Sequence, residues 1–228
     1  MKKSKAIHWF RQDLRLSDNP ALYDGAKNNS ILPIYILDDK NSKDLSMGAA
    51  SKFWLHHSLA SLDKSLNENL SIYQGDPLEI LLDIINRLNI EEIYWNRCYE
   101  PWRIKRDTLI KKELESNGIK VTTLNGSLLW EPWTIKKGDG TPYKVFTPFF
   151  RKGCLLSDEP RKPLPTPNNL DFLHDNDKSL EINDLALLPS IRWDIEMKPF
   201  WNIGEDGANK RLSEFLGNGI ENYNKGRN

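Results

Sequence analysis

The sequence predicts an α/β fold: a doubly wound, Rossmann-like parallel sheet of about five strands, followed by a long linker and the first helices of an all-α domain. In the first half, short apolar runs alternate with segments of helical spacing. These runs are apolar on both faces, as strands covered by helices on both sides require. After residue 156 the composition becomes rich in proline, which predicts that the domain ends there.

Five segments have the composition of strands. Each is rich in apolar or β-branched residues and is bounded by Gly, Asn or Asp, which favour turns. In chain order they are residues 6–10 (AIHWF), 31–37 (ILPIYIL), 70–74 (LSIYQ), 91–96 (EEIYWN) and 118–124 (GIKVTTL).

Two helices are predicted between the first three strands. Asn19-Pro20 combines an N-cap with a proline at the first helical position. The next helix is indicated by leucines that step by four, three and four residues and so form one apolar stripe. These are Leu55, Leu59, Leu62 and Leu66.

Two more helices follow the third and fourth strands. Asp76-Pro77 begins the first of them, and Pro101 begins the second, which ends near Asn117-Gly118. The inner face of the helix after Pro77 is predicted to carry Leu81, Ile84, Ile85 and Leu88.

The proline-rich stretch divides the chain into three parts. We assign residues 1–156 to the α/β domain and residues 157–200 to an extended interdomain linker that crosses its surface. Residues 201–228 return to helical spacing and are predicted to begin a helical domain. One side of that helix carries Ala208, Leu212, Phe215 and Leu216.

Composition narrows the class of protein. Lys+Arg and Asp+Glu balance at 32 each, so no overall field indicates nucleic acid or an anionic membrane as partner. No apolar run reaches the roughly 20 residues that span a bilayer, and no secretory signal is recognisable. The two cysteines and four histidines show no metal-ligand spacing. We expect a cytoplasmic, monomeric protein with no metal.

The stretch WFRQDLRLSDNPAL, residues 9–22, leaves the first predicted strand at the sheet edge where ligands bind in open α/β folds. It lacks the glycine pattern of dinucleotide sites and of phosphate-binding loops. Arg11, Asp13 and Arg15 alternate here. The planar arginine forks suit a carboxylate or phosphate ligand; alternatively, the three charges pair with one another or with a neighbouring domain.

This stretch resembles the N-terminal signature of the DNA photolyase/cryptochrome family, Trp-Phe-Arg-x-Asp-Leu-Arg-x-x-Asp-Asn. YKVFTPFFR, residues 143–151, resembles the family's Tyr-x-Val-Phe-Thr-Pro-Phe segment, and residues 201–228 resemble the entry into its flavin domain. The resemblance spans nearly the whole chain but covers only the first part of the family's architecture, an α/β domain, a wrapping linker and an all-helical domain that holds FAD. It implies structural or domain-docking roles for Arg11, Asp13 and Arg15.

The resemblance further implies the N-terminal part of a deoxyribodipyrimidine photolyase, which uses FAD and blue light to repair cyclobutane pyrimidine dimers in damaged DNA. It implies no catalytic residue within these 228 residues. Tyr223 stands where the family has an FAD-contacting tyrosine, and Arg227 matches an arginine that faces DNA phosphate; from the residues alone they could be a packing aromatic and a terminal charge. The segment expected to hold the FAD phosphates does not occur, so the 228 residues alone are expected to be inactive.

The family's α/β domain often holds an antenna chromophore. The folate type has Asn-Glu shortly after Tyr-Glu, whereas YEPWRIKRD (99–107) has Trp102 and Arg103 there. The Glu-Pro-aromatic sequence instead resembles the deazaflavin or flavin type, which would use Glu100 and could recruit Arg11 and Met47. Alternatively, Glu100 is simply a favourable negative charge at the start of a helix.

Two other functions stay open at this point. A cryptochrome-like blue-light photoreceptor would use the same flavin chemistry to signal to a protein partner, and RQDLRL favours repair over this role. A non-enzymatic α/β binding module is the third possibility, and the helical segment 201–228 argues against it.

Overall fold

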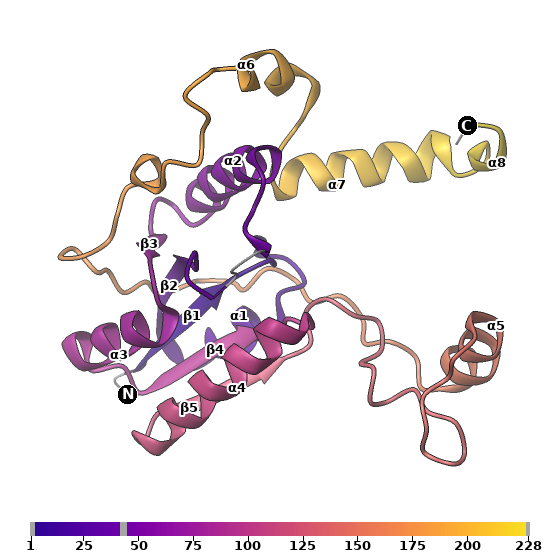
Figure 1. Ribbon diagram of the computed structural model, residues 1–228, viewed down its shortest axis with the longest axis horizontal. Coiled ribbons are helices and arrows are strands. Elements are labelled where there is room, and N and C mark those ends of the chain that lie inside the picture. The colour runs from indigo at the N-terminus through magenta and orange to yellow at the C-terminus, as the bar shows by residue number, and fades with distance from the viewer. Residues whose placement is uncertain (1–2, 42–44, 227–228) are drawn as a thin grey trace.

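The computed structural model describes residues 3–41 and 45–226. Figure 1 shows a twisted parallel sheet with helices on both of its faces. The strand order is β3-β2-β1-β4-β5, and every neighbouring pair is parallel. The strands are β1 (Ser4–Phe10), β2 (Asn29–Leu37), β3 (Ser71–Gln74), β4 (Glu92–Asn96) and β5 (Lys120–Leu124). The predicted doubly wound sheet of five strands is confirmed.

Four helices pack on the sheet and enclose two apolar cores. On one face α1 and α2 cover a core that includes Phe10, Tyr35 and Leu59. On the other face α3 and α4 cover a core that includes Trp9, Ile84 and Leu114. The helices are α1 (Pro20–Gly25), α2 (Ala49–Ser65), α3 (Pro77–Leu88) and α4 (Pro101–Ser116).

The predicted helix starts are correct in detail. The Asn19 side chain accepts a hydrogen bond from the amide of Leu22, and Asp76 accepts from the amides of Leu78 and Glu79. A buried stripe on and just after α2 is formed by the predicted leucines, Leu55, Leu59, Leu62 and Leu66. Capping and periodicity are local signals, which is why the sequence alone locates these helices.

Residues 128–160, which we call the arm, leave the sheet after β5 and lie to one side of it (Figure 1). The arm contains α5 (Phe146–Pro148), a π-helical turn (Phe149–Gly153) and a 3₁₀ turn (Cys154–Leu156). Phe146 and Phe150 stack with ring centroids 5.8 Å apart, and both are exposed. The motif YKVFTPFFR therefore lies off the sheet and presents aromatic side chains to solvent.

Part of the predicted linker packs against the surface of the α/β part that it was expected to cross, and it is more closely packed there than its composition indicates. Residues 171–187, which we call the strap, follow the outer side of β2 and β3. Phe172 bridges to Ile31 of β2, and Leu180 bridges to Ile72 of β3. The strap also buries Leu185 and Leu187 in the core under α2, each 4% exposed. The physical reason is that β3 pairs only with the second half of β2, which leaves backbone groups that another segment must satisfy.

A buried aspartate fixes the strap. Asp175 accepts hydrogen bonds from the Tyr73 hydroxyl at 2.6 Å and from both terminal nitrogens of Arg87, at 2.9 and 2.6 Å. Its side chain is fully buried. The hydrogen bonds from the Arg87 guanidinium hold the pKa of Asp175 well below its usual range, so the carboxylate stays charged.

Short turns and a final helix complete the structure. After a 3₁₀ turn (Ile182–Leu185), α6 (Asp194–Met197) and a further 3₁₀ turn (Lys198–Phe200), α7 (Glu205–Glu214) runs away from the sheet (Figure 1). A π-helical turn (Phe215–Gly219) and α8 (Tyr223–Gly226) follow. The apolar side chains expected on one side of this region are exposed, among them Leu212, Phe215 and Leu216. Among the described residues, no helix has the length and apolar character needed to cross a membrane.

Candidate functional site

A cleft of about 630 Å³ opens at the carboxyl ends of β1 and β2. This is the edge at which ligands bind in open α/β sheets, and the volume is within the range of small-molecule sites. Its walls come from the turn after β1, the end of β2, α2, the first turns of α4 and the start of α7. The lining includes the side chains of Trp9, Arg11, Tyr35, Met47, Trp54, Trp102, Arg103, Arg106 and Glu205.

The turn after β1 is held by hydrogen bonds inside the α/β part. Asp13 accepts from the backbone amide of Arg11 at 3.1 Å and from the side chain of Asn96 at 2.6 Å. Arg15 donates to the carbonyls of Asp18 at 2.9 Å and Gly126 at 2.6 Å. These two charged residues thus tie the turn to neighbouring loops, and this places Arg11 beneath the cleft.

Arg11 is a buried cation with unused donors. Its side chain is 2% exposed and forms an ion pair with Asp107. The guanidinium lies 5.1 Å from the ring centroid of Trp9 and 5.7 Å from that of Trp95. Within the described residues, its Nε and Nη2 have no hydrogen-bond partner. Since a buried donor without a partner is unfavourable, these two N–H groups are available to an acceptor in the cleft.

Two arginines of α4 also line the cleft. Arg106 donates to Asp38 at 2.8 Å and to Asp107 at 2.7 Å, and it lies 5.2 Å from the Trp102 ring. Burial disfavours its charge, but Asp107 and Asp38 more than compensate and raise the pKa of Arg106. Arg103 lies 4.6 Å from the same ring. The cleft therefore combines fixed cations with aromatic faces.

The lining also contains apolar and aromatic side chains. They include Tyr35, Met47 and Trp54, and the latter two are 38% and 43% exposed. Burial raises the pKa of Tyr35 far above its usual range, so its phenol is neutral at physiological pH. A ligand with a planar ring and an anionic group matches this combination of aromatic side chains and arginines.

The predicted site residues fall into different places. Arg11 and Met47 line the cleft. Glu100 is not in its lining: it accepts a hydrogen bond from Gln12 at 2.6 Å and lies 3.4 Å from Arg103, two residues that are in the lining. Burial alone would raise the pKa of Glu100, but hydrogen bonds, including that from Gln12, lower it.

The other two predicted residues lie at the end of the chain. Tyr223 is on α8, where its ring centroid is 6.0 Å from that of Phe215, and it does not line the cleft. Arg227 lies outside the described residues. Sequence reasoning missed several cleft residues, namely Trp54, Arg106 and Glu205. The charged WRIKR segment at the start of α4 was a signal for Arg106, whereas nothing local marks Trp54 or Glu205.

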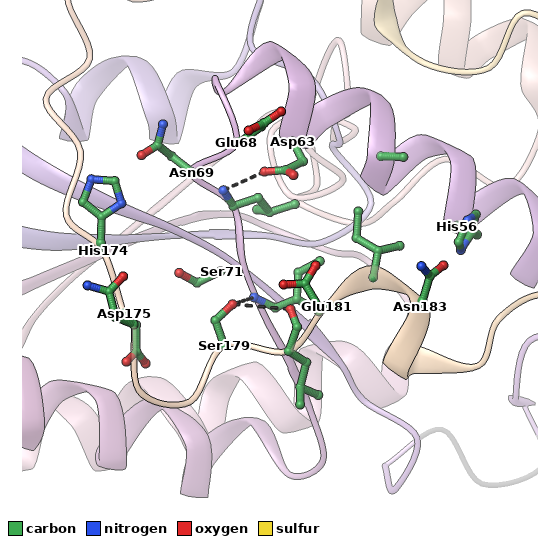
Figure 2. Close-up of a pocket in the computed structure, with 16 residues that line it drawn as sticks. His56, Asp63, Glu68, Asn69, Ser71, His174, Asp175, Ser179, Glu181 and Asn183 are labelled. Atoms are coloured by element: carbon green, nitrogen blue, oxygen red, sulfur yellow. Dashed lines mark hydrogen bonds between the residues drawn. The ribbon is translucent and has the colours of Figure 1, made fainter.

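A second cavity, of about 770 Å³, lies between the end of α2, β3 and the strap (Figure 2). Figure 2 shows Asp63 accepting from the backbone amide of Leu70 and Ser179 accepting from that of Ile72, at 2.9 and 3.0 Å. Its lining in the described part of the chain contains polar side chains and no arginine or lysine. No three metal-ligating side chains gather there or elsewhere in residues 3–41 and 45–226. The cleft is therefore the better candidate site.

Comparison with known proteins identifies the family of this chain. The family model for DNA photolyase matches residues 6–168. The deoxyribodipyrimidine photo-lyase of Agrobacterium fabrum is 35% identical over 232 residues, which cover 100% of this chain and 48% of that protein. Cryptochrome-2 of Arabidopsis thaliana is 31% identical over 97% of this chain and 37% of its own length.

Two solved structures have the same fold. A class III photolyase from Agrobacterium tumefaciens superimposes with a TM-score of 0.91 at 35% identity, over 100% of this chain and 47% of that one. The archaeal photolyase from Sulfolobus tokodaii, solved with two FAD molecules, gives a TM-score of 0.64 at 22% identity over 82% of this chain and 42% of that one.

The chain spans about half the length of the curated relatives it matches, such as the 48% covered in the Agrobacterium fabrum protein. The family model covers most of the α/β part, the arm and the start of the proline-rich segment. On these findings, the chain belongs to the DNA photolyase family.

Proposed function

We propose that these residues form the N-terminal part of a deoxyribodipyrimidine photolyase, which repairs cyclobutane pyrimidine dimers in damaged DNA with FAD and blue light. The observation that carries the proposal is the superposition on a class III photolyase over the full chain, with a TM-score of 0.91. This match includes the arm and α7, which leave the sheet. The second candidate is a cryptochrome-like photoreceptor, because a cryptochrome is 31% identical over 97% of the chain.

In this role the α/β part supports chemistry that the flavin carries elsewhere. Asp13 and Arg15 build the turn after β1, and neither contacts a reacting group. Tyr223 is 51% exposed, whereas a buried cofactor needs a site that closes over most of its surface. We assign Tyr223 to FAD contact and Arg227 to DNA phosphate contact in a longer protein that supplies the rest of the FAD site.

The test uses the natural gene with its flanking sequence. Photolyase-deficient bacteria that carry it are irradiated with UV and then kept in blue light or in the dark. Light-dependent survival, together with loss of thymine dimers from an oligonucleotide treated with the purified protein, supports the proposal. A protein that holds FAD but removes no dimers would point to the photoreceptor. A protein that holds no FAD would point to a binding module.

The cleft supports a second role, as the site of a light-harvesting chromophore of the deazaflavin or flavin type. Arg11 offers its Nε and Nη2 to an anionic group, and Arg103 adds a second cation. Met47, Trp54 and Trp102 offer surfaces to a planar ring. The chromophore would supply light absorption, while these residues bind and orient it. Glu100 would act indirectly, by holding Gln12 and Arg103.

Titration with FMN, and separately with methenyltetrahydrofolate, tests this role by equilibrium dialysis. We expect FMN to bind, and Arg103→Gln to weaken its binding about 10-fold or more, because a hydrogen bond to a charged group is lost. Trp54→Ala should also weaken binding. Trp133→Ala is the matched control, since Trp133 is 50% exposed and lies outside the cleft. Preference for the folate would refute the flavin type, and equal binding by all variants would refute the site.

A further inference from the structure

The first turn of α7 is part of the cleft wall. Gly204, Glu205, Ala208 and Asn209 line the cleft beside residues of β1, β2 and α4. Figure 1 shows that α7 begins near α2 and then runs away from the sheet. A ligand in the cleft would therefore contact the α/β part and the beginning of the helical segment at once.

Glu205 binds the turn after β1 through both of its carboxylate oxygens. One oxygen accepts from the backbone amide of Leu16 at 2.7 Å. The other accepts from the backbone amide of Ser17 at 2.9 Å and from the Ser17 hydroxyl. The three donors belong to residues 188 and 189 positions before Glu205, so its carboxylate forms a long-range polar contact between α7 and the sheet edge.

The backbone at the start of α7 is shaped for this contact. Gly204 has a φ of +111°, a conformation that favours glycine. A Cβ atom there would lie 2.1 Å from Oγ of Ser61 on α2, so the glycine permits a close approach. Just before it, the ring of Trp201 meets the ring of Trp54, a cleft residue, with centroids 5.4 Å apart. The start of α7 is thus held both by the turn after β1 and by α2.

We infer that Glu205 is a positioning residue that couples the cleft to α7. The docked helix completes the cleft wall, and a chromophore in the cleft holds the helix against the sheet edge. Such coupling is reciprocal, because whatever favours docking favours binding by the same factor. The inference rests on the chromophore site proposed above and goes beyond it, because it links occupancy of the cleft to the position of the helical segment.

The central variant is Glu205→Gln, which keeps the shape of the side chain. An amide replaces one acceptor oxygen with an NH₂ group, which then faces the N–H of Leu16 or Ser17 and leaves it unsatisfied. We expect FMN to bind this variant about 10-fold or more weakly. Glu214→Gln is the matched control: Glu214 is on the same helix but pairs at the surface with Arg211.

Hydrogen exchange of the Leu16 and Ser17 amides distinguishes loss of the Glu205 contact from a general loss of stability, because only the former changes these two amides selectively. In the unaltered chain, FMN should slow the exchange of these two amides. In Glu205→Gln they should exchange faster than in Glu214→Gln, while amides of the central strand β1 remain unchanged. Gly204→Ala should reproduce the loss of FMN affinity, because it displaces the start of α7 without changing the Glu205 side chain itself.

The outcomes separate the two proposals. Weaker FMN binding with faster exchange at Leu16 and Ser17 supports the coupling. If Glu205→Gln exchanges faster but binds FMN as tightly as the unaltered chain, the coupling is overturned and the chromophore site stands. If the unaltered chain does not bind FMN, the chromophore site is overturned and the coupling falls with it.

Discussion

The substitution Asp175→Asn tests whether the strap stabilises the α/β part. Asp175 is the residue through which the strap meets both β3, at Tyr73, and α3, at Arg87. Asparagine fits the same space but carries no charge. It can accept through one oxygen only, so at least one of the two Arg87 hydrogen bonds is lost.

The magnitude follows from the burial of the pair. Removing one partner of a fully buried ion pair costs about 3–5 kcal/mol. Arg87 is 22% exposed, so water can replace part of what it loses. We therefore expect a loss of about 2–3 kcal/mol in the free energy of unfolding, below the buried-pair range. At a urea m-value of about 2–3 kcal/mol per molar, the midpoint of unfolding should fall by about 1 M.

Urea unfolding at neutral pH, followed by circular dichroism, measures this loss. Asp177→Asn is the control: Asp177 is 82% exposed and lies 4.0 Å from Arg87, so it should cost less than about 0.5 kcal/mol. The cost of Asp175→Asn should also depend on pH. Because the folded pKa of Asp175 is depressed, its contribution is complete above the unfolded value near 4 and is lost as the pH falls below it. Equal midpoints for the two variants at pH 7 would refute the reasoning.

Three further predictions concern the core and the flavin. Leu59→Ala should cost about 2–5 kcal/mol in unfolding free energy, because Leu59 is 0% exposed, whereas the 59% exposed Leu109 should tolerate alanine within about 0.5 kcal/mol. Burial lowers the pKa of His8 to about 4, so its ring should show no NMR titration above pH 5, and its contribution to stability should be lost as the pH falls from the unfolded value of 6.5 towards 4. The 228-residue chain supplied with excess FAD should remove no thymine dimers under blue light, because a buried cofactor needs a site that closes over most of its surface and Tyr223 is 51% exposed; light-dependent loss of dimers would contradict this.

The sheet and its helices could be predicted because their signals are local. The side chains of Asn19 and Asp76 cap the helices that follow them, so these residues mark the helix starts. The spacing of Leu59 from the neighbouring leucines predicts that it lies on the buried face of its helix. The strap could not be predicted in this way. Leu185 and Leu187 are two residues apart in a segment without period, and their burial depends on an opening beside β2 that only the assembled sheet creates.

The cleft was predictable only in part. Its position follows from strand order, and Arg11 and Met47 were named from the family resemblance. Trp54 was not predicted as a cleft residue, because it is adjacent to the buried Leu55 on α2 and its helical position therefore suggests a surface residue. Glu205 was not predicted as a cleft residue, because its hydrogen-bond partners, Leu16 and Ser17, are nearly 190 residues away in the chain. Contacts of that range depend on packing, which no local pattern encodes.

The strap also has a consequence for synthesis on the ribosome. β3 is the outermost strand on its side, and the strap meets it through Ser179 and Leu180. The sheet is complete once residue 124 has emerged, about 50 residues before these partners, which corresponds to about 3–10 s of translation. During that interval β3 presents an unpaired edge that can recruit strands from other chains. Slow translation of residues 125–180 should therefore increase aggregation of the nascent chain, although in the folded protein the strap covers part of this edge.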